Sequence, residues 1–71
     1  MYKAEICANV PYQNWNYNII GSLHFYNFNR CLTFAINYSK QTSNLVRIYV
    51  DNKWHSSYCF GKEIGTLYKG V

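Results

Sequence analysis

The chain has 71 residues, of which 49% are hydrophobic, 20% aromatic and 14% charged, and its formal net charge is +4. This length allows a single domain over residues 1–71, and the high hydrophobic fraction excludes a disordered tail, which would combine low hydrophobicity with high charge. The seven basic residues are dispersed with no two adjacent, so the charge favours anionic partners in general but forms no basic run that would follow phosphates or anionic lipid.

The cysteines and the N-terminal residues indicate the cellular compartment of the protein. Cys7, Cys31 and Cys59 are odd in number and form no Cys-x-x-Cys pair, which is typical of a reduced, cytoplasmic protein rather than a disulfide scaffold. Lys3 and Glu5 interrupt the region where a secretory signal would need an apolar core, and no run approaches the roughly 18 apolar residues of a membrane span. We therefore expect a cytoplasmic location and no membrane partner.

The first predicted element is a strand over residues 2–10, in which apolar residues alternate with polar ones. Pro11 cannot donate to a strand ladder, so we expect the strand to end there in an Asn-rich loop. Trp15 lies within that loop. It either folds back over the core or serves as an exposed anchor for a partner, and we keep it as a candidate binding residue.

Residues Ile19 to Phe25 and Arg30 to Tyr38 are predicted to form a hairpin with a four-residue loop. This register unites the apolar side chains, because it places Leu23 opposite Leu32 and Gly21 opposite Phe34.

A helix over Phe28 to Ser39 is the alternative for the second half of this hairpin. It would place Phe28, Leu32, Ala35 and Ser39 on one stripe. We favour the strand, because β-branched and aromatic residues are frequent in this segment and no capping residue or C-terminal glycine frames it.

The clearest predicted element is a hairpin within the stretch from Leu45 to Gly61. A three-residue loop over Asp51 to Lys53 pairs Val50 with Trp54, Ile48 with Ser56 and Val46 with Tyr58. We prefer this loop to a two-residue turn at Asp51 and Asn52, because the shorter turn would oppose the apolar residues to Lys53, His55 and Ser57.

The opposite face of this hairpin is mixed, basic and aromatic. It carries Leu45, Arg47, Tyr49, His55, Ser57 and Cys59. Together with Lys53 in the loop, we take Arg47, Tyr49 and His55 as candidate binding residues.

Residues 62–71 are predicted to form either a short closing strand or a helical turn. Five short strands with polar connections predict an all-β domain, a small antiparallel meander that is either a curled sheet or a small barrel. Apolar side chains also lie outside the predicted core face, so we expect a homo-oligomer or a complex with another protein.

No pattern for catalysis, metal or cofactor binding is found. The histidines and cysteines lack the close pairs of a zinc site, and His55 and Cys59 would lie roughly 13 Å apart on a strand. The predicted register opposes His24 to Cys31, which is at most a fragment of a site. The three acidic residues form no pair for acid–base chemistry, and no glycine-rich phosphate loop is present. We therefore expect a protein that is not an enzyme and that has no cofactor and no metal.

Two functions remain. The first is a protein-binding module that occupies a partner surface stoichiometrically, because Tyr, Trp and Arg are enriched in interface hot spots. Small phage and mobile-element inhibitors of host enzymes are similar to this chain in length and composition. The alternative is nucleic-acid or nucleotide binding, in which bases would stack on the basic and aromatic hairpin face, although Arg47-Ile48-Tyr49-Val50 does not match the consensus of RNA-recognition domains.

Overall fold

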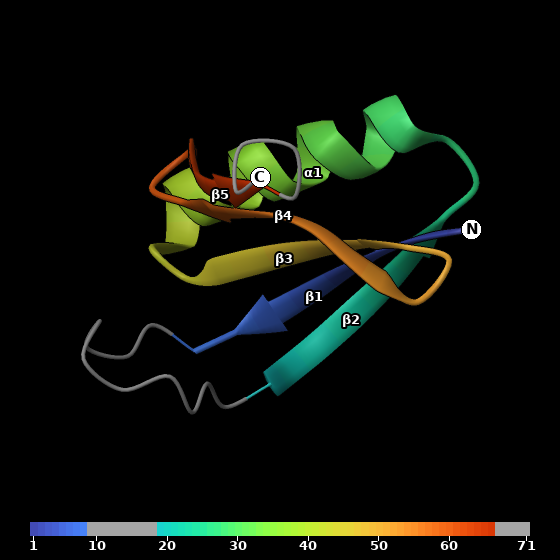
Figure 1. The fold of residues 1–71 in the computed structure, drawn as a ribbon. Helices are drawn as coiled ribbons and strands as arrows, with labels where there is room; N and C mark the ends of the chain where they lie inside the picture. The colour runs from blue at the N-terminus through green and yellow to red at the C-terminus, as the bar shows by residue number, and fades with distance from the viewer. Residues whose placement is uncertain (9–18, 67–71) are drawn as a thin grey trace.

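The computed structural model of the protein describes residues 1–8 and 19–66. In this part of the chain the elements are β1 (Tyr2–Cys7), β2 (Ile19–Phe25), α1 (Phe28–Thr42), β3 (Leu45–Val50), β4 (Lys53–Cys59) and β5 (Lys62–Thr66). The strands form one antiparallel sheet in the order β2-β1-β3-β4-β5, and α1 lies across one face of it (Figure 1). The prediction of a small, mostly β domain with about five antiparallel strands is confirmed, and the sheet is open rather than closed into a barrel.

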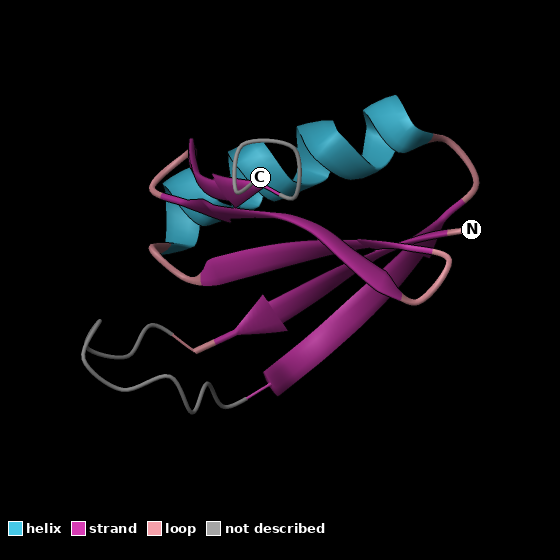
Figure 2. Cartoon of the chain, in the orientation of Figure 1, coloured by secondary structure: helices cyan, strands magenta, loops and turns pink. Residues whose placement is uncertain are grey.

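The chain path makes β1 a central strand. Ala4 on β1 opposes Leu23 on β2 and Ile48 on β3, so β1 is paired on both sides. The chain leaves β2, runs through α1 and returns as β3 on the far side of β1, whereas β3, β4 and β5 follow one another as hairpins (Figure 2). Two strands that are distant in sequence are therefore neighbours at the centre of the sheet.

The strand predicted over residues 30–38 is wrong, because these residues belong to α1. The side chain of Asn27 caps the helix by accepting a hydrogen bond from the backbone N–H of Arg30 at 3.1 Å. At the other end, Ser43 adopts the left-handed conformation and its N–H donates to the carbonyl of Ser39 at 3.1 Å. Both ends of α1 are thus capped, by Asn27 and Ser43, and the prediction that no capping residue frames this segment is wrong.

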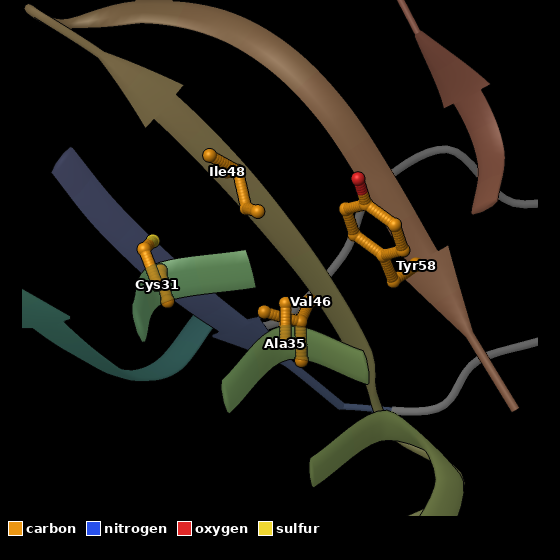
Figure 3. Close-up of a cluster of buried hydrophobic side chains, with 6 residues drawn as sticks. Cys31, Ala35, Val46, Ile48 and Tyr58 are labelled. Atoms are coloured by element: carbon orange, nitrogen blue, oxygen red, sulfur yellow. The ribbon is translucent and has the colours of Figure 1, made fainter. Parts of the chain in front are cut away.

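The buried face of α1 is made of small residues. Cys31, Ala35 and Ser39, spaced four residues apart, are fully buried. This stripe allows the helix to approach the sheet closely and to contact a cluster that includes Val46 and Ile48 on β3 (Figure 3). Larger rings surround this contact, so the small stripe and its aromatic rim together form the main core.

The β3–β4 turn contains two residues rather than the three that were predicted. Asp51 and Asn52 have φ values of 50° and 69°, the pattern of the hairpin turn whose twist matches that of the flanking strands. Val50 therefore opposes Lys53, and the predicted pairing of Val50 with Trp54 is wrong.

The register then shifts by one residue on β4. Tyr49 opposes Trp54, but Ile48 opposes Ser56, so His55 is the extra residue of a β-bulge. Beyond the bulge, the predicted pairs of Ile48 with Ser56 and Val46 with Tyr58 are confirmed. The bulge thus combines a favourable short turn with the apolar register that the core needs.

Two further predictions concern segments that the structure describes only in part. Residues 62–66 form β5, which confirms the strand alternative there, while residues 67–71 lie outside the described residues. The first strand ends at Cys7, and Trp15 with the rest of its loop also lies outside the described residues.

Candidate protein-binding face

The face of the sheet opposite α1 carries polar and aromatic side chains from three strands. Ala4, Val46 and Ile48 pack toward the helix, so the residues that alternate with them point to the other face. That helix-free face carries a group of five residues, which we call the open-face cluster: Lys3, Glu5, Arg47, Tyr49 and Trp54.

The two-residue turn decides which residue of β4 joins this cluster. Trp54, which was predicted to face the core, opposes Tyr49 and donates its indole N–H to the Ser57 hydroxyl at 2.9 Å. His55, predicted to lie beside Arg47 and Tyr49, instead contacts the ring of Phe28 on the helix side, with 5.2 Å between ring centroids. The two-residue turn, one residue shorter than predicted, therefore exchanges the faces of Trp54 and His55, and the bulge at His55 restores the predicted faces from Ser56 onward.

Glu5 organises the charges of the open-face cluster. It lies directly opposite Arg47 on the neighbouring strand, and an Arg47 Nη2 atom is 2.7 Å from Glu5 Oε1. The ammonium of Lys3 is 3.8 Å from Glu5 Oε2. Because the Glu5 side chain is buried, its carboxylate holds the Lys3 ammonium and the Arg47 guanidinium close to the sheet.

The aromatic part of the open-face cluster is also held in place. Lys3 opposes Tyr49 across the strands, and its ammonium lies 4.7 Å from the centroid of the tyrosine ring, a cation–π contact. Trp54 is held by the hydrogen bond from its indole N–H to the Ser57 hydroxyl. The two rings are therefore adjacent, half-buried and restrained by contacts within the chain.

Burial and neighbouring charges shift the pKa values of three groups on this face. Burial raises the pKa of the Cys7 thiol, although Arg47 opposes the shift. Burial also raises the pKa of the Tyr49 hydroxyl. For Arg47, burial alone would lower the pKa, but Cys7, Tyr49 and Glu5 raise it, and the net direction is upward. At neutral pH Cys7 is therefore a thiol, Tyr49 a phenol and Arg47 a guanidinium cation.

Lys53 and His55 line a pocket together with Trp54 of the open-face cluster. It has a volume of about 640 Å³ and lies where the start of α1 meets the β3–β4 turn. Its walls are formed by Tyr2, Phe28, Val50, Asp51, Lys53, Trp54 and His55. Of the predicted binding residues, the structure therefore brings Arg47 and Tyr49 together, places Lys53 and His55 at this pocket, and does not describe Trp15.

The predicted opposition of His24 and Cys31 is wrong. His24 lies on β2 opposite Lys3, whereas Cys31 is buried in α1, where burial raises the pKa of its thiol to about 11. Within residues 1–8 and 19–66, no group of three or more histidine, cysteine or acidic side chains is arranged to hold a metal ion.

Lys3, Glu5 and Trp54 are the cluster members that the sequence-based argument did not select. Strand alternation did place Lys3 and Glu5 on one solvated face, but only the order of strands in the sheet places that face beside Arg47.

Across the described ranges, no helix has the length and apolar character that crossing a membrane requires. Comparison of the chain with protein-family models, curated proteins and solved structures gives no match.

Proposed function

We propose that this protein is a non-enzymatic binding module that occupies an acidic surface of a partner protein, in the stoichiometric manner of a small inhibitor. The observation that carries the proposal is the gathering of Arg47, Tyr49 and Trp54, which are half-buried, on the sheet face opposite α1. Arginine, tyrosine and tryptophan are the residue types that dominate the energetics of protein interfaces.

The open-face cluster is preorganised for binding. Trp54 is held by Ser57, Tyr49 by Lys3, and Arg47 by Glu5. Ordering a long side chain on association costs about 0.5–1.5 kcal/mol, and this cost is reduced where the side chain is already restrained. A partner therefore meets a surface whose main contact residues already have fixed positions.

The charge of the cluster indicates the chemistry of the partner. Lys3 and Arg47 contribute two positive charges and Glu5 one negative charge, and the whole chain carries +4. A protein surface rich in Asp and Glu complements this field and is steered toward it.

Single-stranded nucleic acid is the second candidate, because Tyr49 and Trp54 are adjacent rings beside two cations and offer surfaces for base stacking. The distribution of charge argues against it, because binding to a nucleic-acid backbone requires cations that follow the phosphates, whereas the seven basic residues are dispersed with no two adjacent. We therefore rank protein binding first.

The test compares face variants in a binding assay. The intact chain, with an affinity tag, is used to capture partners from native cell extract with and without nuclease, and the captured protein is then titrated in purified form. We expect one partner per chain, nuclease-resistant capture, and at least tenfold weaker binding for Tyr49→Ala and for Trp54→Ala. Tyr26→Ala is the matched control, because Tyr26 is 89% exposed and outside the open-face cluster.

Two results would overturn the proposal. One is a captured protein whose affinity is unchanged by Tyr49→Ala and Trp54→Ala. The other is capture that nuclease abolishes, with a labelled oligonucleotide bound more weakly as salt rises, which would establish the nucleic-acid alternative.

A further inference from the structure

One end of the molecule holds a pocket that the proposed function does not use. The start of α1, the β3–β4 turn and the N-terminus lie together at this end (Figure 1). The volume of the pocket is about 640 Å³. Sites for small molecules have volumes of roughly 300–1,000 Å³, so the pocket has the size to hold one.

Aromatic rings form the walls of this pocket on the helix side of the sheet. The centroid of the Phe28 ring lies 5.5 Å from that of Tyr2 and 5.2 Å from that of His55, and both pairs meet edge to face. All three rings are half-buried, so each keeps part of its surface open to solvent. A planar aromatic ring is the shape of ligand that continues this series of edge-to-face contacts.

The rings have fixed positions within the fold. Tyr2 lies on the central strand β1, and Phe28 is the first residue of α1. The bulge in β4 gives His55 its place, because Ser56 opposes Ile48 in the core while the extra residue, His55, contacts Phe28. A hydrogen bond between His55 Nδ1 and Ser56 Oγ, at 2.9 Å, restrains the imidazole ring. Fixed walls reduce the cost of ordering side chains when a ligand binds.

The charges around the pocket favour an anionic group. Lys53 is exposed in the wall and forms no ion pair with any described residue. The carboxylate of Asp51 is 3.0 Å from the N-terminal ammonium, so its charge is already paired. The first turn of α1 has no acidic side chain, so the positive end of the helix dipole adds to the field of Lys53. An aromatic cage for an ammonium group would need the opposite charge.

We infer that this pocket binds a small molecule that combines a planar aromatic ring with a carboxylate. The ring of the ligand packs against Phe28 and His55, and its carboxylate lies beside the ammonium of Lys53. The inference goes beyond the proposed function and does not depend on it, because Arg47 and Tyr49 lie on the opposite face of the sheet and only Trp54 borders both sites.

The first experiment titrates the whole ¹⁵N-labelled chain with indole-3-propionate at pH 7 and follows the backbone amide signals by NMR. For a probe of this size we expect a dissociation constant on the order of 1 mM, with the largest shifts at Phe28, Lys53 and His55. Tryptamine has the same ring with a cationic group and should bind at least about fivefold more weakly. The anion 3-cyclohexylpropionate lacks a planar ring and should bind at least about threefold more weakly.

Variants test the two halves of the site. Lys53→Glu should weaken indole-3-propionate at least about fivefold and should not weaken tryptamine. Lys62→Glu is the matched control, because it makes the same change of charge at an exposed position of β5 outside the pocket, and its affinity should stay within about twofold of the wild type. Phe28→Leu keeps an apolar side chain but removes the central ring, and should weaken the probe at least about threefold. If Phe28→Leu does not fold, the comparison with 3-cyclohexylpropionate on the wild type still tests the ring.

Several results would overturn the inference. One is the absence of saturable shifts at the pocket up to about 10 mM indole-3-propionate, tenfold above the expected constant. Others are equal affinities for indole-3-propionate and tryptamine, or equal effects of Lys53→Glu and Lys62→Glu. Tighter binding of the blocked peptide acetyl-Glu-Trp-Glu-amide than of the free probe would assign the pocket to a partner protein instead of a small molecule. Tyr49→Ala should bind the probe normally while losing the protein partner, so failure of the proposed function and failure of this inference are distinguishable.

Discussion

The contact between Glu5 and Arg47 gives the sharpest prediction for stability. Glu5→Gln keeps the size of the side chain but removes the carboxylate charge that lies 2.7 Å from Arg47. The Glu5 side chain is 10% exposed and the Arg47 side chain 25% exposed, so neither is fully hydrated when the pair is broken. The variant therefore leaves a partly desolvated guanidinium facing a neutral amide.

The magnitude follows from this burial. Removing one partner of a fully buried ion pair costs about 3–5 kcal/mol, whereas exposed pairs contribute about 0–1 kcal/mol. Arg47 retains some access to water, so we expect Glu5→Gln to lower the free energy of unfolding by about 2 kcal/mol, an intermediate value. Lys3→Gln is the matched comparison, because Lys3 is farther from Glu5 at 3.8 Å and its side chain is 30% exposed. It should cost less than about 1 kcal/mol, including the lost contact with Tyr49.

The assay is urea unfolding at pH 7, monitored by far-ultraviolet circular dichroism at a protein concentration where the chain is monomeric. A double-mutant cycle with Arg47→Gln should give a coupling energy of at least about 1 kcal/mol. A Glu5→Gln cost below about 0.5 kcal/mol, or a cost equal to that of Lys3→Gln, would refute the argument that Glu5 organises this face.

Three further predictions concern the helix, a turn and the thiols. Asn27→Ala removes the helix cap and should lower the free energy of unfolding by about 1 kcal/mol in the same assay. The control Asn37→Ala, at an exposed helical position, should not lower it. Equal effects of the two substitutions would contradict the capping role of Asn27. Gly61→Ala should cost about 1 kcal/mol or more, because Gly61 has a φ of 77° and a Cβ there would lie 3.1 Å from Cβ of Lys40; a stabilised variant would show that the turn is not constrained in this way. Burial raises the pKa of Cys31 from 9.0 to about 11, so its contribution to stability is complete below pH 9 and is lost as the pH rises from 9 to 11. Unfolding measured across this pH range should therefore show a steeper loss for the wild type than for Cys31→Ala, and parallel curves would contradict the assignment.

Strand periodicity, and the pairs that follow from it, were determined by the sequence alone. The alternation from Tyr2 to Cys7 and the pairs of Val46 with Tyr58 and Ile48 with Ser56 could be predicted because side chains on a strand change face at every residue. That local rule also separated Arg47 and Tyr49 from the core.

Only the tertiary structure decided the state of residues 28–42. Phe34, Ile36 and Tyr38 favour a strand locally, but burying Cys31, Ala35 and Ser39 against the sheet requires a helix, and burial outweighs weak intrinsic propensities. The faces of Trp54 and His55 also depended on context, because the β3–β4 turn contains two residues rather than three.

The open-face cluster itself depends on the order of the strands. Lys3 and Glu5 are more than 40 residues away from Arg47 and Tyr49 in the chain, and β1 meets β3 because the chain passes through α1 and returns beside β1. Local alternation determines which side chains share a face of one strand, whereas the packing of the helix over the whole sheet determines which strands are neighbours.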